Sequence, residues 1–130
     1  MKRAALIALI LLGAGCKQQD AALMLNMTGP FLVPQNANKL HIDVFDTPQG
    51  TLVLGKDWCY QPTPTCELLP AMVNGLNATV TIVESGAQHP RVKINVTLLL
   101  DSTTVGVGTL NADFQDGTTV QVSIPITRPL

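Results

Sequence analysis

Charge and aromatic rings are scarce in this chain of 130 residues, and it has only three cysteines. Charged residues make up 13% of the sequence and aromatic residues 4%, and the net charge is −1. No run of lysine or arginine could form a basic patch, so we expect no nucleic-acid partner. Hydrophobic residues reach 46%, enough to build a buried core, and this excludes a chain that stays disordered.

Long apolar runs are also missing, except near the start. Residues 4–12, "AALIALILL", are too short to span a bilayer, which needs about 20 residues. They follow Lys2 and Arg3 and precede the small residues "GAG". A basic start, a short apolar core and small residues are the three parts of a secretory signal. The sequence therefore predicts a signal peptide over residues 1–15; the alternative is a buried core helix.

Cys16 follows this segment directly, in the stretch "GAGC". The stretch resembles the lipobox of bacterial lipoproteins, in which leucine and two small residues precede a cysteine that receives diacylglycerol. The lipobox has its leucine three positions before the cysteine, where this chain has Gly13, and Leu12 lies one position earlier. The resemblance implies cleavage before Cys16 and its acylation, with palmitate among the acyl chains. The rival prediction is an ordinary secretory signal cut near Gly15, which would leave a free thiol.

Lipidation at Cys16 would fix both the location and the domain layout. In lipoproteins of Gram-negative type, aspartate after the cysteine favours the inner membrane; Lys17 stands there instead, which implies the outer membrane of a bacterial cell envelope. Residues 16–22 then form the lipidated cysteine and a short tether, and residues 23–130 one β domain. Without residues 1–15 the chain has six basic and nine acidic residues, a net charge of −3.

Apolar and polar residues alternate with a period of two along most of the domain. In residues 91–100, for example, Val92, Ile94 and Val96 share one face. Each such segment has one apolar face, so two sheets must pack together. The sequence predicts an all-β fold, a two-sheet antiparallel β-sandwich of about seven strands. The expected strands are 23–28, 39–45, 51–55, 78–84, 91–100, 105–114 and 119–127.

Three details of the last two strands can also be predicted. The alternation changes phase near Gly108, which indicates a bulge. Asp116 and Gly117 between these strands indicate a hairpin. Pro125 lacks a backbone N–H, which indicates that the last strand either lies at an edge of its sheet or bulges there.

The whole layout is similar to that of the small immunoglobulin-like or transthyretin-like lipoproteins of bacterial envelopes. The resemblance covers about residues 23–127 and includes "LHIDVFD", "RVKINVTLLL" and "DGTTVQVSIPI". It implies a structural or protein-interaction role, with the membrane reached through the N-terminal lipid and an envelope protein or glycan as the partner. Antibody-type domains have a disulfide between their sheets, whereas the cysteine pair of this chain is local.

Cys59 and Cys66 remain as an even pair once Cys16 is committed to lipid. In an oxidising compartment we expect them to form a disulfide that closes "CYQPTPTC". A zinc site would need two more ligands, and neither His41 nor His89 has a metal-ligand spacing to these cysteines. A redox centre would normally show Cys-x-x-Cys.

Trp58 and Tyr60, the only tryptophan and tyrosine of the chain, flank Cys59. Rigid aromatic side chains on a closed loop suit binding, so an alternative function is carbohydrate or peptide binding by residues 57–67. The other interpretation is that the aromatic ring plugs the core. We favour the plug for Trp58 and leave both interpretations open for Tyr60.

Catalytic signatures are absent: the sequence has no nucleophile elbow, zinc-protease motif or phosphate loop. His41 and Asp43 share a strand face, and we expect His41 to be a solvated strand residue. Turn capping explains the acidic residues near the turns better than calcium binding does. We therefore expect no enzyme activity, metal or cofactor. These acidic residues are Asp101, Asp113 and Asp116, and the Asn-x-Thr triplets that we discount as glycan acceptors start at Asn26, Asn77 and Asn95.

Overall fold

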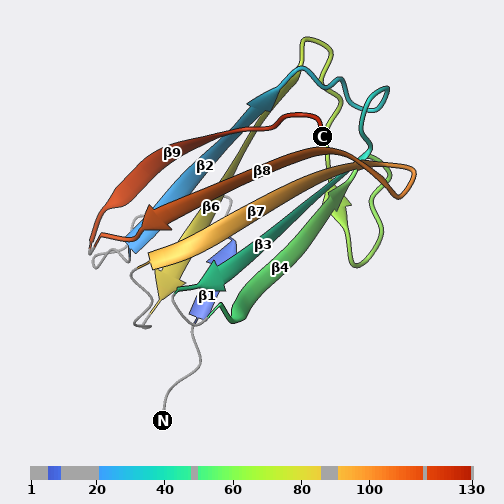
Figure 1. Ribbon diagram of the computed structural model, residues 1–130. Coiled ribbons are helices and arrows are strands. Elements are labelled where there is room, and N and C mark those ends of the chain that lie inside the picture. Colours follow the sequence, from blue (N-terminus) through green and yellow to red (C-terminus); the bar gives the residue numbers. More distant parts are fainter. Residues whose placement is uncertain (1–5, 10–20, 48–49, 86–90, 116, 130) are drawn as a thin grey trace.

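Nine strands in two sheets, with no helix, make up the part of the chain that the computed structural model describes, which is residues 6–9, 21–47, 50–85, 91–115 and 117–129. One sheet has the order β1-β6-β2-β9 and the other β5-β4-β3-β7-β8 (Figure 1). The predicted β-sandwich is therefore confirmed. The strands are β1 (Leu6–Leu9), β2 (Ala21–Gly29), β3 (Lys39–Asp46), β4 (Leu52–Cys59), β5 (Glu67–Leu68), β6 (Leu76–Ser85), β7 (Arg91–Leu100), β8 (Thr103–Asp113) and β9 (Thr119–Pro125).

The core forms between the sheets from the apolar positions of the alternating pattern. On β7 every second residue from Val92 to Leu98 is buried, while Arg91, Lys93 and their neighbours on the other face are more exposed. Each fully buried aliphatic side chain stabilises the fold by about 1.5–3 kcal/mol relative to an exposed one. The largest of the side chains that are almost completely buried in this core are Phe31, Leu23, Leu25, Met27, Leu40, Ile42, Leu69, Ile82, Ile94, Leu98, Ile124 and Ile126.

The predicted hairpin between the last two strands is wrong. β8 pairs with β7 in one sheet, whereas β9 pairs in parallel with β2 in the other. The two strands face each other across the core: a Cβ placed on Gly108 would lie 2.8 Å from Ile124 Cγ2. Phe114, only 7% exposed, follows β8 and anchors the crossing. The edge position predicted for Pro125 is confirmed, because β9 ends the order of its sheet.

The bulge in β8 lies at Val105 and not near Gly108. The β7–β8 register shifts where Leu98 pairs with Gly106 and Leu99 with Thr104. From Gly106 onward the inward positions keep one phase through Gly108, so no second shift is needed. The inward positions of this stretch are Gly106 and Gly108, where Phe31, Ile124 and Ile126 leave no room for larger side chains.

The strand order differs from that of immunoglobulin constant domains. Among the seven longest strands, the first, fourth and seventh (β2, β6 and β9) form one sheet with β1, and the other four lie in the second sheet. In the immunoglobulin order the first, second, fourth and fifth strands share a sheet.

The two ends of the sandwich carry different parts of the chain. β2 starts at the end where β3 finishes and β4 begins, and it runs to the opposite end, where Cys59 closes β4 (Figure 1). The C-terminal segment lies at that second end (Figure 1). Within the described ranges, no helix has the length and hydropathy needed to cross a membrane.

Candidate functional site

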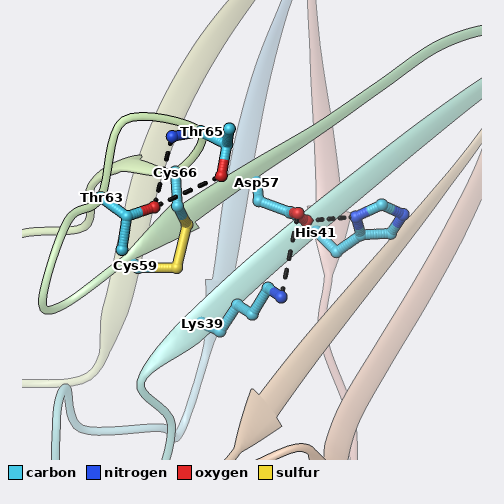
Figure 2. Close-up of a disulfide and its surroundings, with 7 residues drawn as sticks. All are labelled: Lys39, His41, Asp57, Cys59, Thr63, Thr65 and Cys66. Carbon is cyan, nitrogen blue, oxygen red and sulfur yellow. Dashed lines mark hydrogen bonds and ion pairs between the residues drawn. A yellow bond between two sulfur atoms is a disulfide. The ribbon is translucent and has the colours of Figure 1, made fainter.

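The candidate site is the disulfide loop that follows β4. Cys59 is the last residue of β4, and Cys66 directly precedes β5. Their sulfur atoms are bonded and their Cα atoms lie 5.6 Å apart, so the predicted disulfide is confirmed (Figure 2). A closed loop of this length stabilises the folded chain by about 2.5 kcal/mol in the chain-entropy model.

Backbone hydrogen bonds hold the loop in one conformation as well. Thr63 N donates to Cys66 O at 2.9 Å, and Cys66 N donates to Thr63 O at 3.2 Å. Thr65 N also donates to Thr63 Oγ1 at 3.3 Å (Figure 2). Pro62 and Pro64 fix two backbone φ angles in the same stretch. The tip is therefore ordered by its own chain in addition to the disulfide.

The loop is joined to the sandwich on both sides. Tyr60 N donates to Asn38 O at 2.9 Å, and Leu69 N donates to Cys59 O at 2.7 Å. Lys56 Nζ on β4 lies 2.6 Å from Glu67 Oε2 on β5. These contacts hold the short strand β5 along β4.

The two aromatic residues of the loop lie in different surroundings. Trp58 pairs across the sheet with Leu40 and is 7% exposed as part of the core. The plug that we favoured for Trp58 is therefore confirmed. Tyr60 is 37% exposed. Tyr60 is thus the aromatic residue of the loop that a partner can reach.

Two exposed apolar residues between the loop and β6 were not singled out from the sequence. Leu68 is 56% exposed and pairs with Cys59 through β5, and Val73 is 72% exposed in the segment before β6. Together with Tyr60 they are three of the five large exposed hydrophobic residues in the described part of the chain. β5 has two residues, too few for a period of two to show in the sequence. We call Tyr60, Leu68 and Val73 the apolar tip.

A row of charged side chains lies on the outer face of β3 and β4. Asp57 on β4 is directly opposite His41 on β3. His41 Nδ1 contacts Asp57 Oδ1, and His41 Nε2 lies 2.9 Å from Asp43 Oδ1. Lys39 Nζ lies 3.8 Å from Asp57 Oδ2 (Figure 2). His41 is therefore held between two carboxylates and is more than a solvated strand residue.

Both ring nitrogens of His41 are engaged within the sheet, Nδ1 by Asp57 and Nε2 by Asp43. No group of three or more His, Cys, Asp or Glu side chains in the described ranges is placed to hold a metal ion. The sequence could not indicate the Asp57 partner, because that contact depends on the β3–β4 register.

The acidic residues near the turns have separate partners. Asp113 accepts a hydrogen bond from Arg91 Nε at 2.8 Å, which lowers the pKa of Asp113 and raises the pKa of Arg91. The turn-capping prediction is therefore wrong for Asp113, which is ion-paired across the β7–β8 ladder. Asp101 lies in the β7–β8 turn, where its Oδ1 accepts from Asn38 Nδ2 at 3.0 Å. Asp116 lies outside the described residues.

Most of the predicted signal and anchor segment also lies outside the described residues. This holds for Cys16 and for residues 17–20 of the tether. β1 lies inside the predicted signal peptide and pairs with the last four residues of β6.

Comparisons with known proteins identify no relative: no family model matches the chain, and neither do curated proteins or solved structures.

Proposed function

We propose that this protein is a lipid-anchored β-sandwich of the bacterial cell envelope with a structural or protein-interaction role and no enzyme activity. The signal-like residues 1–15 and Cys16 support the anchor. The observation that carries the interaction role is the position of the disulfide loop, at the end of the sandwich opposite the start of β2 (Figure 1).

The lengths of the tether and of β2 determine how far the disulfide loop lies from the membrane. Four residues separate Cys16 from β2, so a lipid on Cys16 holds the start of β2 within about 17 Å of the bilayer surface. β2 has nine residues and spans about 30 Å. The apolar tip then lies at the membrane-distal end, where a partner in the envelope can reach it.

The anchor is tested by substituting the lipidated residue. Cys16→Ser should move the protein from the membrane to the soluble fraction, and globomycin should make the uncut precursor of the unsubstituted chain accumulate. Lys17→Asp is the matched variant for sorting: it should stay lipidated but move from the outer to the inner membrane. A Cys16→Ser protein that still floats with membranes would contradict the proposal.

A second candidate function is carbohydrate or peptide binding by residues 57–67. It is favoured by Tyr60, 37% exposed beside a loop that a disulfide and its own hydrogen bonds hold in place. Tyr60→Ala should then abolish retention on immobilised envelope glycan or peptide, while Tyr60→Phe keeps most of it. Equal retention of wild type and Tyr60→Ala would exclude this use of the loop.

A further inference from the structure

β6 is the strand whose outer edge changes if residues 1–15 are removed. β2 pairs with β6 along nine residues from Leu76 to Glu84, and β1 pairs with it on the other side at Ile82–Ser85 only. Ala8 is opposite Val83 in this antiparallel register. Within the described residues, the stretch from Leu76 to Thr81 has a strand neighbour on the β2 side alone.

β1 also contacts β4, so it joins one sheet to the other along this side of the sandwich. Leu54 of β4, which is opposite Val44 on the inner face of its sheet, packs partly buried against the core. Ile82 on β6 is fully buried beneath the same side. Removal of β1 therefore opens a strand edge that is flanked by aliphatic side chains.

An open strand edge of this kind accepts another strand readily. Its unpaired N–H and C=O groups are a template for main-chain hydrogen bonds, and the side chains at alternate positions select the sequence that binds. The structure shows the kind of segment that fits, because "LIAL" of β1 is extended, uncharged and aliphatic. A segment with charges or proline would fit less well.

We infer that the processed protein binds an extended aliphatic segment of a partner protein, added antiparallel to β6 in the register that β1 occupies in the precursor. This inference rests on the proposed removal of residues 1–15. The site is distinct from the apolar tip, since Ile82–Ser85 lie at the end of the sandwich where β2 starts.

The test uses the full protein from the bacterial envelope, with its N-terminus established by intact mass. The probe is a synthetic peptide of residues 4–11 flanked by lysines for solubility, with a photo-reactive leucine at the position of Ala8. Irradiation should attach it to Ile82–Ser85 of the processed protein. N-methylation of alternate peptide nitrogens removes the donors, and the yield should then fall about tenfold.

Two precursor variants separate this inference from the proposed processing. The globomycin-accumulated precursor should be labelled weakly because β1 occupies the edge, whereas Ile7→Pro in that precursor should restore labelling and Ile7→Val should not. An uncut N-terminus in the purified protein would contradict the proposed function, and the Ile7→Pro precursor would still test the site. Labelling that ignores N-methylation, or that misses β6 in both the processed and Ile7→Pro proteins, overturns the inference. A β6–β6 crosslinked dimer that the peptide cannot displace would assign the edge to a second copy and also overturn it.

Discussion

The two long sides of the sandwich are closed in different ways. On the side of β8 and β9, Val107 and Thr127 exchange two backbone hydrogen bonds of 2.8 and 3.0 Å. Gly106 and Gly108 let the C-terminal segment approach: a Cβ on Gly108 would lie 2.6 Å from Ile126 Cδ1. On the side of β4 and β6, the four residues of β1 make the connection.

The difference shows two ways in which the edges of the two sheets of a β-sandwich can be joined. Two sheets can be joined where a strand has no side chains in the way, and the glycines of β8 provide this. The other side has no such glycines in β4 or β6 at the point where β1 lies, and Gly55 of β4 instead neighbours Asp43 on the outer face. One side is thus closed by residues that stay in the protein, and the other by a segment that we expect to be cut off.

The largest effect should come from Trp58→Ala, which tests whether β4 is held by the core independently of β1. Trp58 is 7% exposed, and removing its ring should lower the free energy of unfolding by about 3–5 kcal/mol. Urea unfolding followed by circular dichroism measures this. Tyr60→Ala, at a more exposed ring two residues away, is the control and should change stability by less than about 1 kcal/mol. Wild-type stability of Trp58→Ala would mean that the ring belongs to a binding surface.

Gly108→Val should disrupt the contact between β8 and the C-terminal segment. The new side chain would clash with Ile124, Ile126 and the carbonyl oxygen of Pro125, all within 2.9 Å of its Cβ. Overpacking of this kind costs about 1–3 kcal/mol. Val107→Thr, on the exposed face of the same strand, should stay within about 0.5 kcal/mol of wild type in the same urea titration. Equal midpoints for the two variants would refute the role given to the glycine.

Ile7→Pro in the uncut chain should open the other side at little cost. The few hydrogen bonds of β1 gain about 1 kcal/mol each, and ordering its residues costs about as much. We therefore expect nearly unchanged stability but faster amide hydrogen exchange at Ile82–Ser85. Ile7→Val should leave that exchange slow. A large loss of stability with Ile7→Pro would show that both sides are structurally equivalent.

The smallest effect concerns Arg91 and Asp113, which are paired with each other across the β7–β8 ladder. The hydrogen bond from Arg91 lowers the pKa of Asp113 below that of the unfolded chain. The pair therefore stabilises the fold above the unfolded-state pKa of about 3.9, and this is lost as the pH falls through the lower folded-state pKa. Because both groups are solvent-exposed, the contribution is small and screened by salt. Asp113→Asn should have a slightly lower urea midpoint than wild type at pH 6, and the difference should shrink as the pH falls below the unfolded-state pKa of the carboxyl group.

The architecture could be predicted because the burial of a strand residue shows in the alternation of apolar and polar residues along its own segment. Residues such as Val92, Ile94 and Val96 repeat with the period of a strand whatever lies opposite. Which strands pair with each other leaves no such pattern in the sequence. A chain that turns back as a hairpin and one that crosses to the other sheet have the same alternation, so the partner of β9 was predicted wrongly.

The same distinction applies to the candidate site, where some features follow from the local sequence and others depend on strand pairing. The disulfide followed from cysteine number and compartment, and the burial of Trp58 followed from the tendency of a large aromatic ring to plug the core at the end of the sandwich. His41 and Asp57 are 16 residues apart, and their contact depends on the register of two strands. Leu68 belongs to a two-residue strand that leaves no periodic signal.

The pairing of β5 with β4 matters for the chain before the Cys59–Cys66 disulfide forms. It lies parallel to the end of β4, pairing Trp58 with Glu67 and Cys59 with Leu68, and so covers an edge that could otherwise pair with a neighbouring molecule. The disulfide ties this cover to the strand that it protects. Buried aliphatic side chains hold the sandwich itself, so reduction should leave it folded while releasing the cover. Loss of the disulfide would then show first as self-association of folded molecules, and export to an oxidising compartment would act as a safeguard of solubility.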